Sequence, residues 1–272
     1  MAASSSSAIR MAAEGSPRVT KREPAQPEGF RWLRLSKLTY VDKKGKTRFW
    51  EVAERCHAAA PSADSSSSSS SSKKKVDGVF ICATIVRKTR PPELLLIRQF
   101  RPPMDCEVVE FVAGLIDAGE TPEQAALREL KEETGYSEGV TVTKVTAGMP
   151  LDPGMSNSCA GVVFVEIDGD HPANLNPVAC PEDGEYIVPF TVPFPDLETV
   201  LGKMESDGYA IDVAVWCYAF GWLAASRRRG EGSSGRGRFV ASPGQICVAV
   251  AGLAAGAALV ARASSFLSRR RS

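Results

Sequence analysis

The stretch that most constrains this chain runs from Gly114 to Tyr136 and reads GLIDAGETPEQAALRELKEETGY. It places Glu129, Glu132 and Glu133 within five residues of a segment with helical periodicity. Side chains four residues apart are neighbours on one face of a helix, so the first and last of these carboxylates repel each other by a few tenths of a kcal/mol. The sequence therefore predicts a compensating positive charge near this helix.

Capping residues mark both ends of the helix. Thr121 is a favourable N-cap, Pro122 suits the first helical position, and Gln124 completes a capping box. Gly135 follows the last periodic residue and can adopt the left-handed conformation that ends many helices. These signals predict a helix from about Pro122 to Thr134.

The helix is expected to have a packed side and an acidic side. The packed side would consist of Ala125, Ala126, Leu127 and Leu130, with the three glutamates towards the opposite side. Gly114 and Gly119 let the preceding loop fold tightly and bring Glu120 back over the helix. Carboxylates that converge from a loop and a helix form an all-oxygen site suited to Mg²⁺, with Mn²⁺ as a substitute, and Arg128 would orient one of them. A solvated acidic helix face is the alternative interpretation.

The rest of the chain predicts a layered domain. Two pairs of segments read as hairpins, WLRLSKLTYVD with TRFWEVAER and GVFICATIVRK with ELLLIRQF. Further strands are expected at EVVEFVAG, AGVVFVEID and EYIVPFTV, and helices at PDLETVLGKMES and AIDVAVWCYAFGWLAAS, with Trp216, Phe220 and Trp222 in the core. The predicted fold class is α/β (α+β layered), a mixed sheet sandwiched between helices, with antiparallel strands at its N-terminal end.

Composition narrows the classes of partner and compartment. A net charge of +1 over 272 residues gives no reason to expect nucleic acid as a partner. The seven cysteines are scattered, without a C-x-x-C pair, which argues against a zinc site and a disulfide framework and suits a reducing compartment. The protein is therefore expected in the cytoplasm, with the nucleus as a second compartment.

Low-complexity segments surround and interrupt the expected domain. Residues 1–28 are rich in Ser, Ala, Pro and charge and are expected to be disordered. The domain is placed at residues 29–226, with a serine-rich insertion at 57–75 that is expected to be a solvated loop. A basic, glycine-rich linker is placed at 227–238 and an apolar tail at 239–272.

The apolar tail allows two interpretations. Residues 239–261 carry no charge and would span about 34 Å as a helix, against a hydrocarbon core of about 30 Å. However, residues 246–261 are mostly Ala, Gly and Val, and Pro243 would break the helix near its start. A soluble enzyme with an extension and a protein tail-anchored through 239–261, with its domain in the cytosol, both stay open.

The acidic helix and its loop also match a known pattern. The stretch resembles the Nudix box, G-x5-E-x7-R-E-U-x-E-E-x-G-U with U hydrophobic, at each fixed position from Gly114 to Gly135, and Tyr136 fills the last hydrophobic position. RQFRPP, DPGMSNS and DGEYIV are similar to the ADP-sugar pyrophosphatase branch of the Nudix hydrolases, specifically the animal ADP-ribose type. The resemblance implies a Nudix fold, Mg²⁺-dependent hydrolysis of ADP-ribose to AMP and ribose 5-phosphate, and a homodimer that exchanges N-terminal strands.

The resemblance further implies roles for individual residues. The implied metal ligands are the backbone oxygen of Ala113, Glu129 and Glu133, with Glu120 beside them. The implied catalytic residues are Glu185 as general base, Glu132 and Arg128. The implied substrate contacts are Trp32 and Trp50 on adenine, Arg101 and Arg55 on phosphates, Asp152 on the sugar, and Leu115.

Two other functions stay open at this point. One is hydrolysis of UDP-sugars or other nucleoside diphosphates, although the tryptophan pair favours a purine. The other is a nucleotide-binding module without catalysis, although such a module has no use for mutually repelling glutamates. The segment PPMDCEVVEFVAG also lacks the glycine-containing turn usual after RPPM, so an altered approach to the following strand is expected.

Overall fold

The computed structural model describes residues 18–24, 32–55, 76–181 and 184–230. The serine-rich segment 57–75, residues 231–238 of the expected linker and the apolar tail 239–272 lie outside the described residues, as does most of the segment 1–28. The chain forms two compact units. One consists of residues 1–75 and Met149–Cys159, and the other of Val76–Gly148 and residues 160–272.

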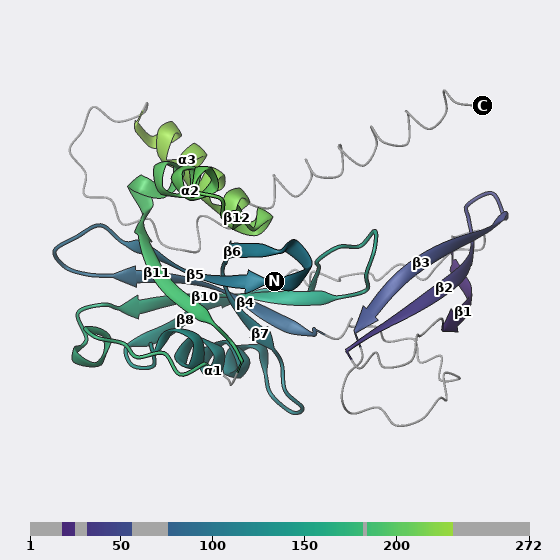
Figure 1. Ribbon diagram of the computed structural model, residues 1–272, viewed down its shortest axis with the longest axis horizontal. Helices are drawn as coiled ribbons and strands as arrows, with labels where there is room; N and C mark the ends of the chain where they lie inside the picture. The colour runs from purple at the N-terminus through teal and green to yellow at the C-terminus, as the bar shows by residue number, and fades with distance from the viewer. Residues whose placement is uncertain (1–17, 25–31, 56–75, 182–183, 231–272) are drawn as a thin grey trace, which may run out of the picture. The chain divides into compact units, whose positions relative to one another are not determined.

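The first unit contains a three-stranded antiparallel sheet (Figure 1). Its strands are β1 (Arg18–Pro24), β2 (Leu33–Val41) and β3 (Thr47–Arg55), and the short strand β9 (Met149–Pro150) belongs to the same unit. The predicted hairpin of β2 and β3 is confirmed. Asp42 closes its turn by accepting hydrogen bonds from the backbone N–H groups of Lys44 (2.9 Å) and Lys46 (3.0 Å).

The strand β1 corrects the expectation that residues 1–28 are disordered. Arg18–Pro24 pairs with the edge of β2 in antiparallel orientation. Its polar composition gives no local signal for a strand. The strand is instead ordered by hydrogen bonds from a neighbouring strand, which local composition does not reveal.

The second unit is built on a mixed sheet. The strand order is β12-β6-β5-β4-β10-β8, with β11 paired to β5 and β7 paired to β4. The strands are β4 (Gly78–Val86), β5 (Glu93–Arg101), β6 (Cys106–Glu110), β7 (Val112–Leu115), β8 (Val140–Val145), β10 (Cys159–Asp168), β11 (Ile187–Pro193) and β12 (Ala210–Ile211). The β4–β10 and β6–β12 pairs are parallel and the others antiparallel, which confirms the predicted mixed sheet.

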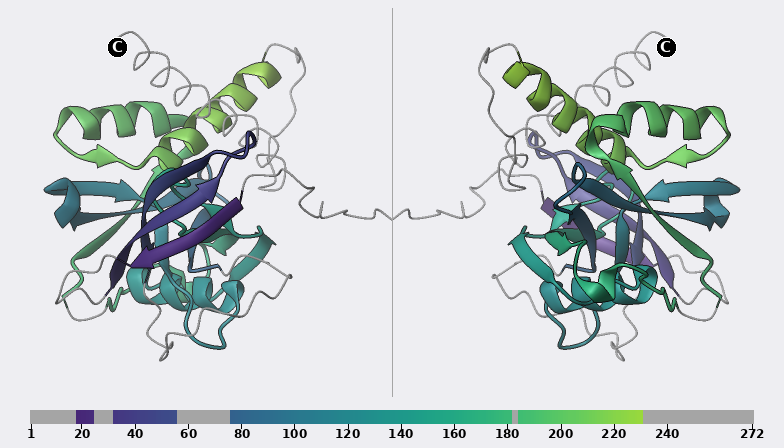
Figure 2. Two further views of the ribbon diagram at one scale, coloured as in Figure 1. Left: turned by 90° about the vertical axis from the view of Figure 1, so that its right-hand side faces the viewer. Right: turned by 90° about the vertical axis from the view of Figure 1, so that its left-hand side faces the viewer.

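Helices cover both faces of this sheet (Figures 1 and 2). The helix α1 (Pro122–Thr134) lies on one face, and α2 (Leu197–Ser206) and α3 (Val213–Gly230) lie on the other. Short 3-10 helices at Pro102–Met104 and Pro172–Asn174 lie between strands, and another at Phe194–Asp196 leads from β11 into α2. Along β5, Leu95 and Ile97 pack in the core under α1, whereas Leu94 and Leu96 pack in the core under α2 and α3. One hydrophobic run thus serves two cores, because successive side chains of a strand point to opposite faces.

Two strand predictions are modified by the structure. EVVEFVAG forms two strands, since β6 pairs with β5 and β7 pairs with β4, with Phe111 between them. The turn before β6 is closed by Asp105 in the left-handed conformation (φ 53°, ψ 31°), in place of a glycine. Aspartate tolerates this region better than most residues, so the turn before β6 forms without glycine.

The helix α3 differs from the sequence prediction in two respects. Phe220 was expected in the core but is 47% exposed. Trp216 and Trp222, also expected there, are partly buried against the core under α2 and α3. The helix is apolar on several sides, so its periodicity does not identify the inner face. It also continues to Gly230, through residues expected to start the linker. No helix in the described part of the chain has both the length and the apolar composition needed to cross a membrane.

The cap of α1 gives a stability prediction. Gly135 has a φ of 80°, and a Cβ added there would lie 2.4 Å from the backbone nitrogen of Val178. Gly135→Ala is therefore expected to destabilise the protein by about 1–3 kcal/mol, measured by thermal unfolding.

The matched control is Gly202→Ala inside α2, where an added Cβ has no heavy atom within 4 Å outside its own helix backbone. Alanine should stabilise that position by up to about 1 kcal/mol. Equal unfolding temperatures for wild type and Gly135→Ala would contradict the prediction.

Candidate active site

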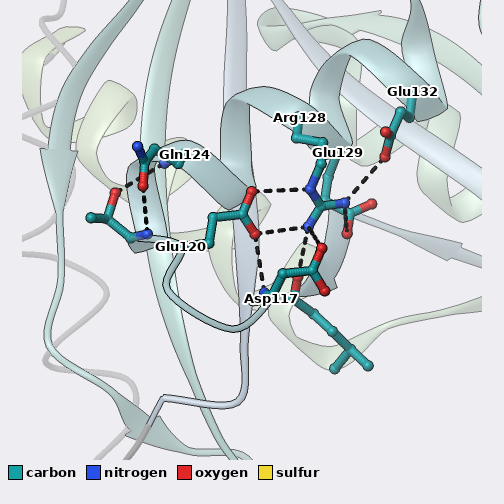
Figure 3. A network of polar contacts seen from close by, with 8 residues as sticks. Asp117, Glu120, Gln124, Arg128, Glu129 and Glu132 are labelled. Carbon is teal, nitrogen blue, oxygen red and sulfur yellow. Dashed lines mark hydrogen bonds and ion pairs between the residues drawn. The ribbon is translucent and has the colours of Figure 1, made fainter. Parts of the chain in front are cut away.

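The guanidinium of Arg128 lies at the centre of a polar network on α1 (Figure 3). Its Nε and Nη2 donate hydrogen bonds to the two carboxylate oxygens of Glu120, at 3.0 Å each. Its Nη1 donates to Glu129 at 2.8 Å and to Glu132 at 3.2 Å, and Nη2 also donates to the carbonyl oxygen of Leu115 at 2.9 Å. The network therefore holds three glutamates together and attaches the loop after β7 to the helix.

Arg128 supplies positive charge that the clustered glutamates require. Hydrogen bonds from Arg128 lower the pKa of Glu120, and in turn the bonds to Glu120 raise the pKa of Arg128. Glu120, expected beside the metal ligands, thus directs both oxygens to Arg128. In the described ranges, His, Cys, Asp and Glu side chains form no group of three arranged to hold a metal ion. At this helix, three of the acids are gathered around Arg128 instead.

The side chains of Glu129 and Glu133 lie against the end of β7. Glu133 is only 4% exposed and accepts a hydrogen bond from the backbone N–H of Ala113 at 3.4 Å. Glu129 occupies the space over Gly114, where an added Cβ would lie 1.9 Å from its carboxyl carbon. A side chain at position 114 would therefore displace the carboxylate of Glu129. The structure thus brings the two glutamates and the backbone of Ala113 together.

Two positions of α1 lie on the opposite side from the one predicted. Glu133 was expected on the acidic side but is buried, and Leu127 was expected on the packed side but is 41% exposed. Ala126, Leu130 and Glu133 follow each other at spacings of four and three residues, so they share one side of the helix. Glu133 thus continues the stripe that contacts the core, and Leu127 falls outside it.

The environment of Glu133 disfavours its negative charge. Burial raises the pKa of Glu133 to about 8, and the charge of Glu129 adds to this effect. Burial also raises the pKa of Glu129, although hydrogen bonds from Arg128 oppose the shift. A cation between these carboxylates would relieve both costs, and carboxylate oxygens are the ligands that hard divalent cations prefer. The residues present therefore fit a divalent metal ion.

The charges of Arg101 and Glu185 act on the carboxylate of Glu133. After burial and the charge of Glu129, the charges of Glu185 and Arg101 also act on the pKa of Glu133, the first raising it and the second lowering it. Arg101 ends β5, and Glu185 is an exposed residue that precedes β11. The segment before Glu185 is attached to α1, since the N–H of Cys180 donates to the carbonyl oxygen of Glu132 at 2.8 Å.

The structure adds a residue that the sequence prediction missed. Glu110, at the end of β6, accepts a hydrogen bond from Nε of Arg101 at 2.8 Å. The available signal was a single acid inside the apolar run VVEFV, which identifies a strand residue with a polar partner but does not identify the partner.

The remaining predicted residues belong to the first unit. Trp32 and Trp50 are 65% and 50% exposed, and Arg55 and Asp152 are also exposed. Trp50 is paired with Leu38 of β2, whereas Trp32 precedes the first residue of β2, Leu33. Six residues of extended chain separate Trp32 from Leu38, so the two tryptophans lie about 20 Å apart along the hairpin. Rings that enclose a single base must stand at about twice the stacking distance, so these two cannot do so within one chain.

A cavity of about 180 Å³ opens beside Trp50. Its lining consists of Arg22, Leu38, Trp50, Val52, Pro150, Pro153, Met155, Ser156 and Asn157. The indole Nε1 of Trp50 donates to the carbonyl oxygen of Gly154 at 2.9 Å, which fixes the ring. An aromatic wall beside hydroxyl, amide and guanidinium groups suits a planar ligand with polar edges.

The pKa of Glu133 predicts how stability depends on pH in buffer containing EDTA. The value is about 8 in the folded chain, against an ordinary value of 4.5. Between these pH values the folded protein retains a proton that the unfolded chain has lost, so ionisation of Glu133 reduces stability as pH rises. Glu133→Gln removes this loss. Its melting temperature should exceed that of wild type at about pH 8.5 and approach it near about pH 4.5.

The control is Glu138→Gln, which changes an exposed glutamate just beyond α1. This variant should follow the wild-type melting temperature across the same pH range. Parallel curves for wild type and Glu133→Gln would show that burial of Glu133 has no energetic cost.

Comparison with known proteins connects this geometry to a family. The NUDIX domain model matches residues 75–207. An uncharacterized Nudix hydrolase of Schizosaccharomyces pombe is 37% identical over 211 residues, covering 78% of this chain and 95% of the relative. The ADP-sugar pyrophosphatase of Mus musculus is 36% identical over 189 residues (69% and 80%), and the ADP-ribose pyrophosphatase of Saccharomyces cerevisiae is 37% identical over 210 residues (77% and 84%). The resemblance predicted from the glutamate helix is confirmed, and the chain belongs to the Nudix hydrolase family.

Proposed function

We propose that the protein hydrolyses the diphosphate bond of ADP-sugars, chiefly that of ADP-ribose to give AMP and ribose 5-phosphate. The observation that carries this proposal is the juxtaposition of Glu129 and buried Glu133 at the end of β7. Support for the substrate comes from the mouse and yeast relatives, which are named for ADP-sugars and ADP-ribose. This chain covers 80% and 84% of their lengths.

A divalent metal ion is the cofactor that this family generally requires. We propose Mg²⁺, with Mn²⁺ as a substitute, held by Glu129, Glu133 and the backbone oxygen of Ala113. When bound, the ion would neutralise negative charge that develops on the oxygens of the diphosphate. The role of Arg128 is to keep Glu129 and Glu132 in place, and Glu120 fixes Arg128 from the other side.

The proton and the phosphates are handled by residues around this group. Glu185 would act as general base and accept a proton from the attacking water, because an exposed carboxylate near Glu133 can reach both substrate and solvent. Arg101 would bind the phosphates through charge-assisted hydrogen bonds. By resemblance, Arg55 is a second phosphate contact, Asp152 a sugar contact and Leu115 a substrate contact.

The hairpin of the first unit supports a homodimer. Since Trp32 and Trp50 of one chain stand too far apart to enclose one base, adenine would lie between Trp50 of one chain and Trp32 of another. The face of the same hairpin that lies away from Trp50 exposes Leu33, Leu35 and Phe49 at 44%, 46% and 62%. Such an apolar face is suited to a partner chain, as expected for subunits that exchange N-terminal strands. Cytoplasmic localisation, with the nucleus as a second compartment, is proposed from the scattered cysteines.

A substrate panel tests the proposal. Purified full-length protein is assayed with ADP-ribose, UDP-glucose, 8-oxo-dGDP and dinucleotides, each with Mg²⁺, with Mn²⁺ and with EDTA. ADP-ribose with Mg²⁺ is expected to give the highest kcat/KM. A preference for UDP-glucose would move the assignment to UDP-sugars, and nucleotide binding without hydrolysis would identify a non-catalytic module.

Glu133→Gln is expected to abolish most of the Mg²⁺-dependent turnover while the protein stays folded. The substitution keeps the size of the side chain but removes the charge of a metal ligand, so kcat for ADP-ribose should fall by orders of magnitude. The exposed Glu138→Gln variant is the matched control and should retain wild-type kcat. Near-normal Mg²⁺-dependent activity of Glu133→Gln would exclude the assigned metal site.

Trp50→Ala and Glu185→Gln should affect different kinetic constants. Stacking binds ground state and transition state alike, so Trp50→Ala should raise KM for ADP-ribose about tenfold with a smaller change in kcat. Loss of the general base in Glu185→Gln should instead lower kcat by about a hundredfold or more. Steady-state kinetics over a range of ADP-ribose concentrations separates the two effects. The roles are wrong if Trp50→Ala unfolds with no change in KM, or if Glu185→Gln retains wild-type kcat.

A further inference from the structure

Glu110 forms a contact that the proposed mechanism leaves without a role. Its Oε2 accepts hydrogen bonds from Nε of Arg101 at 2.8 Å and from the side-chain amide of Gln99 at 3.2 Å. The side chain of Glu110 is 16% exposed, whereas that of Arg101 is 43% exposed. The acid is thus held below the surface, and the arginine that it binds extends outward from it.

The strand register places this contact on the side of the sheet that faces α1. Glu110 lies opposite Ile97, and Gln99 and Arg101 follow Ile97 at alternate positions of β5. Alternate residues of a strand share a face, and Ile97 packs in the core formed with Ala125, Ala126 and Leu130 of α1. Glu110, Gln99 and Arg101 therefore continue the face on which Glu133 is buried.

We propose that Glu110 is a positioning residue for Arg101, and this role rests on the proposed hydrolysis of ADP-sugars. A guanidinium is planar, with its five N–H donors in a fixed fork. When Nε is bound to a carboxylate, rotation of the fork is restricted, and the terminal Nη nitrogens remain for a second anion. Glu110 thus presents the Nη edge of Arg101 to the phosphates of the substrate, and Gln99 fixes the orientation of Glu110.

The opposite face of the same strand pair provides a matched control. Arg98 of β5 donates from Nη1 to Glu107 of β6 at 3.2 Å and to the hydroxyl of Tyr209 at 2.5 Å. Arg98 lies on the same face of β5 as Leu94 and Leu96, which pack under α2 and α3. A substitution at Glu107 therefore removes the same kind of arginine–glutamate pair from the same strands, on the face away from Glu133.

Variants at position 110 separate positioning from charge. Glu110→Ala removes the acceptor, Glu110→Asp keeps the charge but shortens the side chain, and Glu110→Gln keeps an acceptor at the same reach. The full-length variants are compared by calorimetric binding of the non-hydrolysable α,β-methylene analogue of ADP-ribose with Mg²⁺, and by KM and kcat for ADP-ribose. We expect the Ala and Asp variants to bind the analogue about tenfold more weakly, with a matching rise in KM. The Gln variant should stay within about threefold of wild type, and Glu107→Ala within about twofold.

A double variant tests whether Glu110 acts through Arg101. Arg101→Ala alone should weaken analogue binding, and adding Glu110→Ala should weaken it no further, because contacts that act as one unit are not additive. If the alanine variant does not fold, the aspartate variant is used for the same comparison.

Three results would overturn the positioning role while leaving the proposed function intact. The first is that the Ala and Asp variants bind the analogue as tightly as wild type. The second is that either variant binds it more tightly, which would make Glu110 a competitor of the substrate for Arg101. The third is that the losses of binding in the double variant are additive. A wild-type protein that neither binds the analogue nor hydrolyses ADP-ribose would instead refute the proposed function, and the positioning role with it.

Discussion

Holding like charges close together is the constraint on which the rest of this structure depends. Four glutamates come from one helix and the loop before it, and in water their mutual repulsion would spread them apart. Two devices oppose that tendency. The guanidinium of Arg128 binds Glu120, Glu129 and Glu132, and the fourth acid, Glu133, is buried where it keeps its proton up to an unusually high pH. The carboxylates of the helix therefore favour the binding of a cation that accompanies the substrate.

The fold places the partners of these acids by simple geometric rules. The strand β5 is hydrophobic on both faces, so it is held between two cores and its end is fixed in position. Arg101 stands at that end, on the α1 side by alternation. The end of β7 is fixed by pairing with β4, which brings Ala113 and Gly114 under the helix. Rigid strands therefore position the backbone of Ala113 and Gly114 and the guanidinium of Arg101. The helix positions the carboxylates.

Local signals in the sequence predicted the parts of the site that depend on local chemistry. Thr121, Gln124 and Gly135 defined the helix because capping involves only neighbouring residues. Contacts between elements far apart in the sequence were harder to predict. The burial of Glu133 and exposure of Leu127 depend on where β7 meets the helix, and β1 depends on an edge offered by β2. Phe220 was misplaced because α3 is apolar on several sides, and the partner of Glu110 follows from a register that no single segment encodes.

The two ion pairs between β5 and β6 also bear on how the sheet assembles. Arg98 with Glu107 and Arg101 with Glu110 lie on opposite faces of adjacent strands. If β6 slipped by one residue during folding, each glutamate would move to the other face of the sheet, because the side-chain period is two. A slip in one direction would place Glu110 opposite Leu96, which packs in the core under α2 and α3, whereas a slip in the other direction would place Glu110 opposite Arg98 and Glu107 opposite Arg101. The hydrophobic residues Val108 and Val109 are too alike to penalise such a slip strongly. The ion pairs therefore penalise a slip in one direction, which would carry the carboxylate of Glu110 into a hydrophobic core, whereas a slip in the other direction would exchange the partners of the two glutamates.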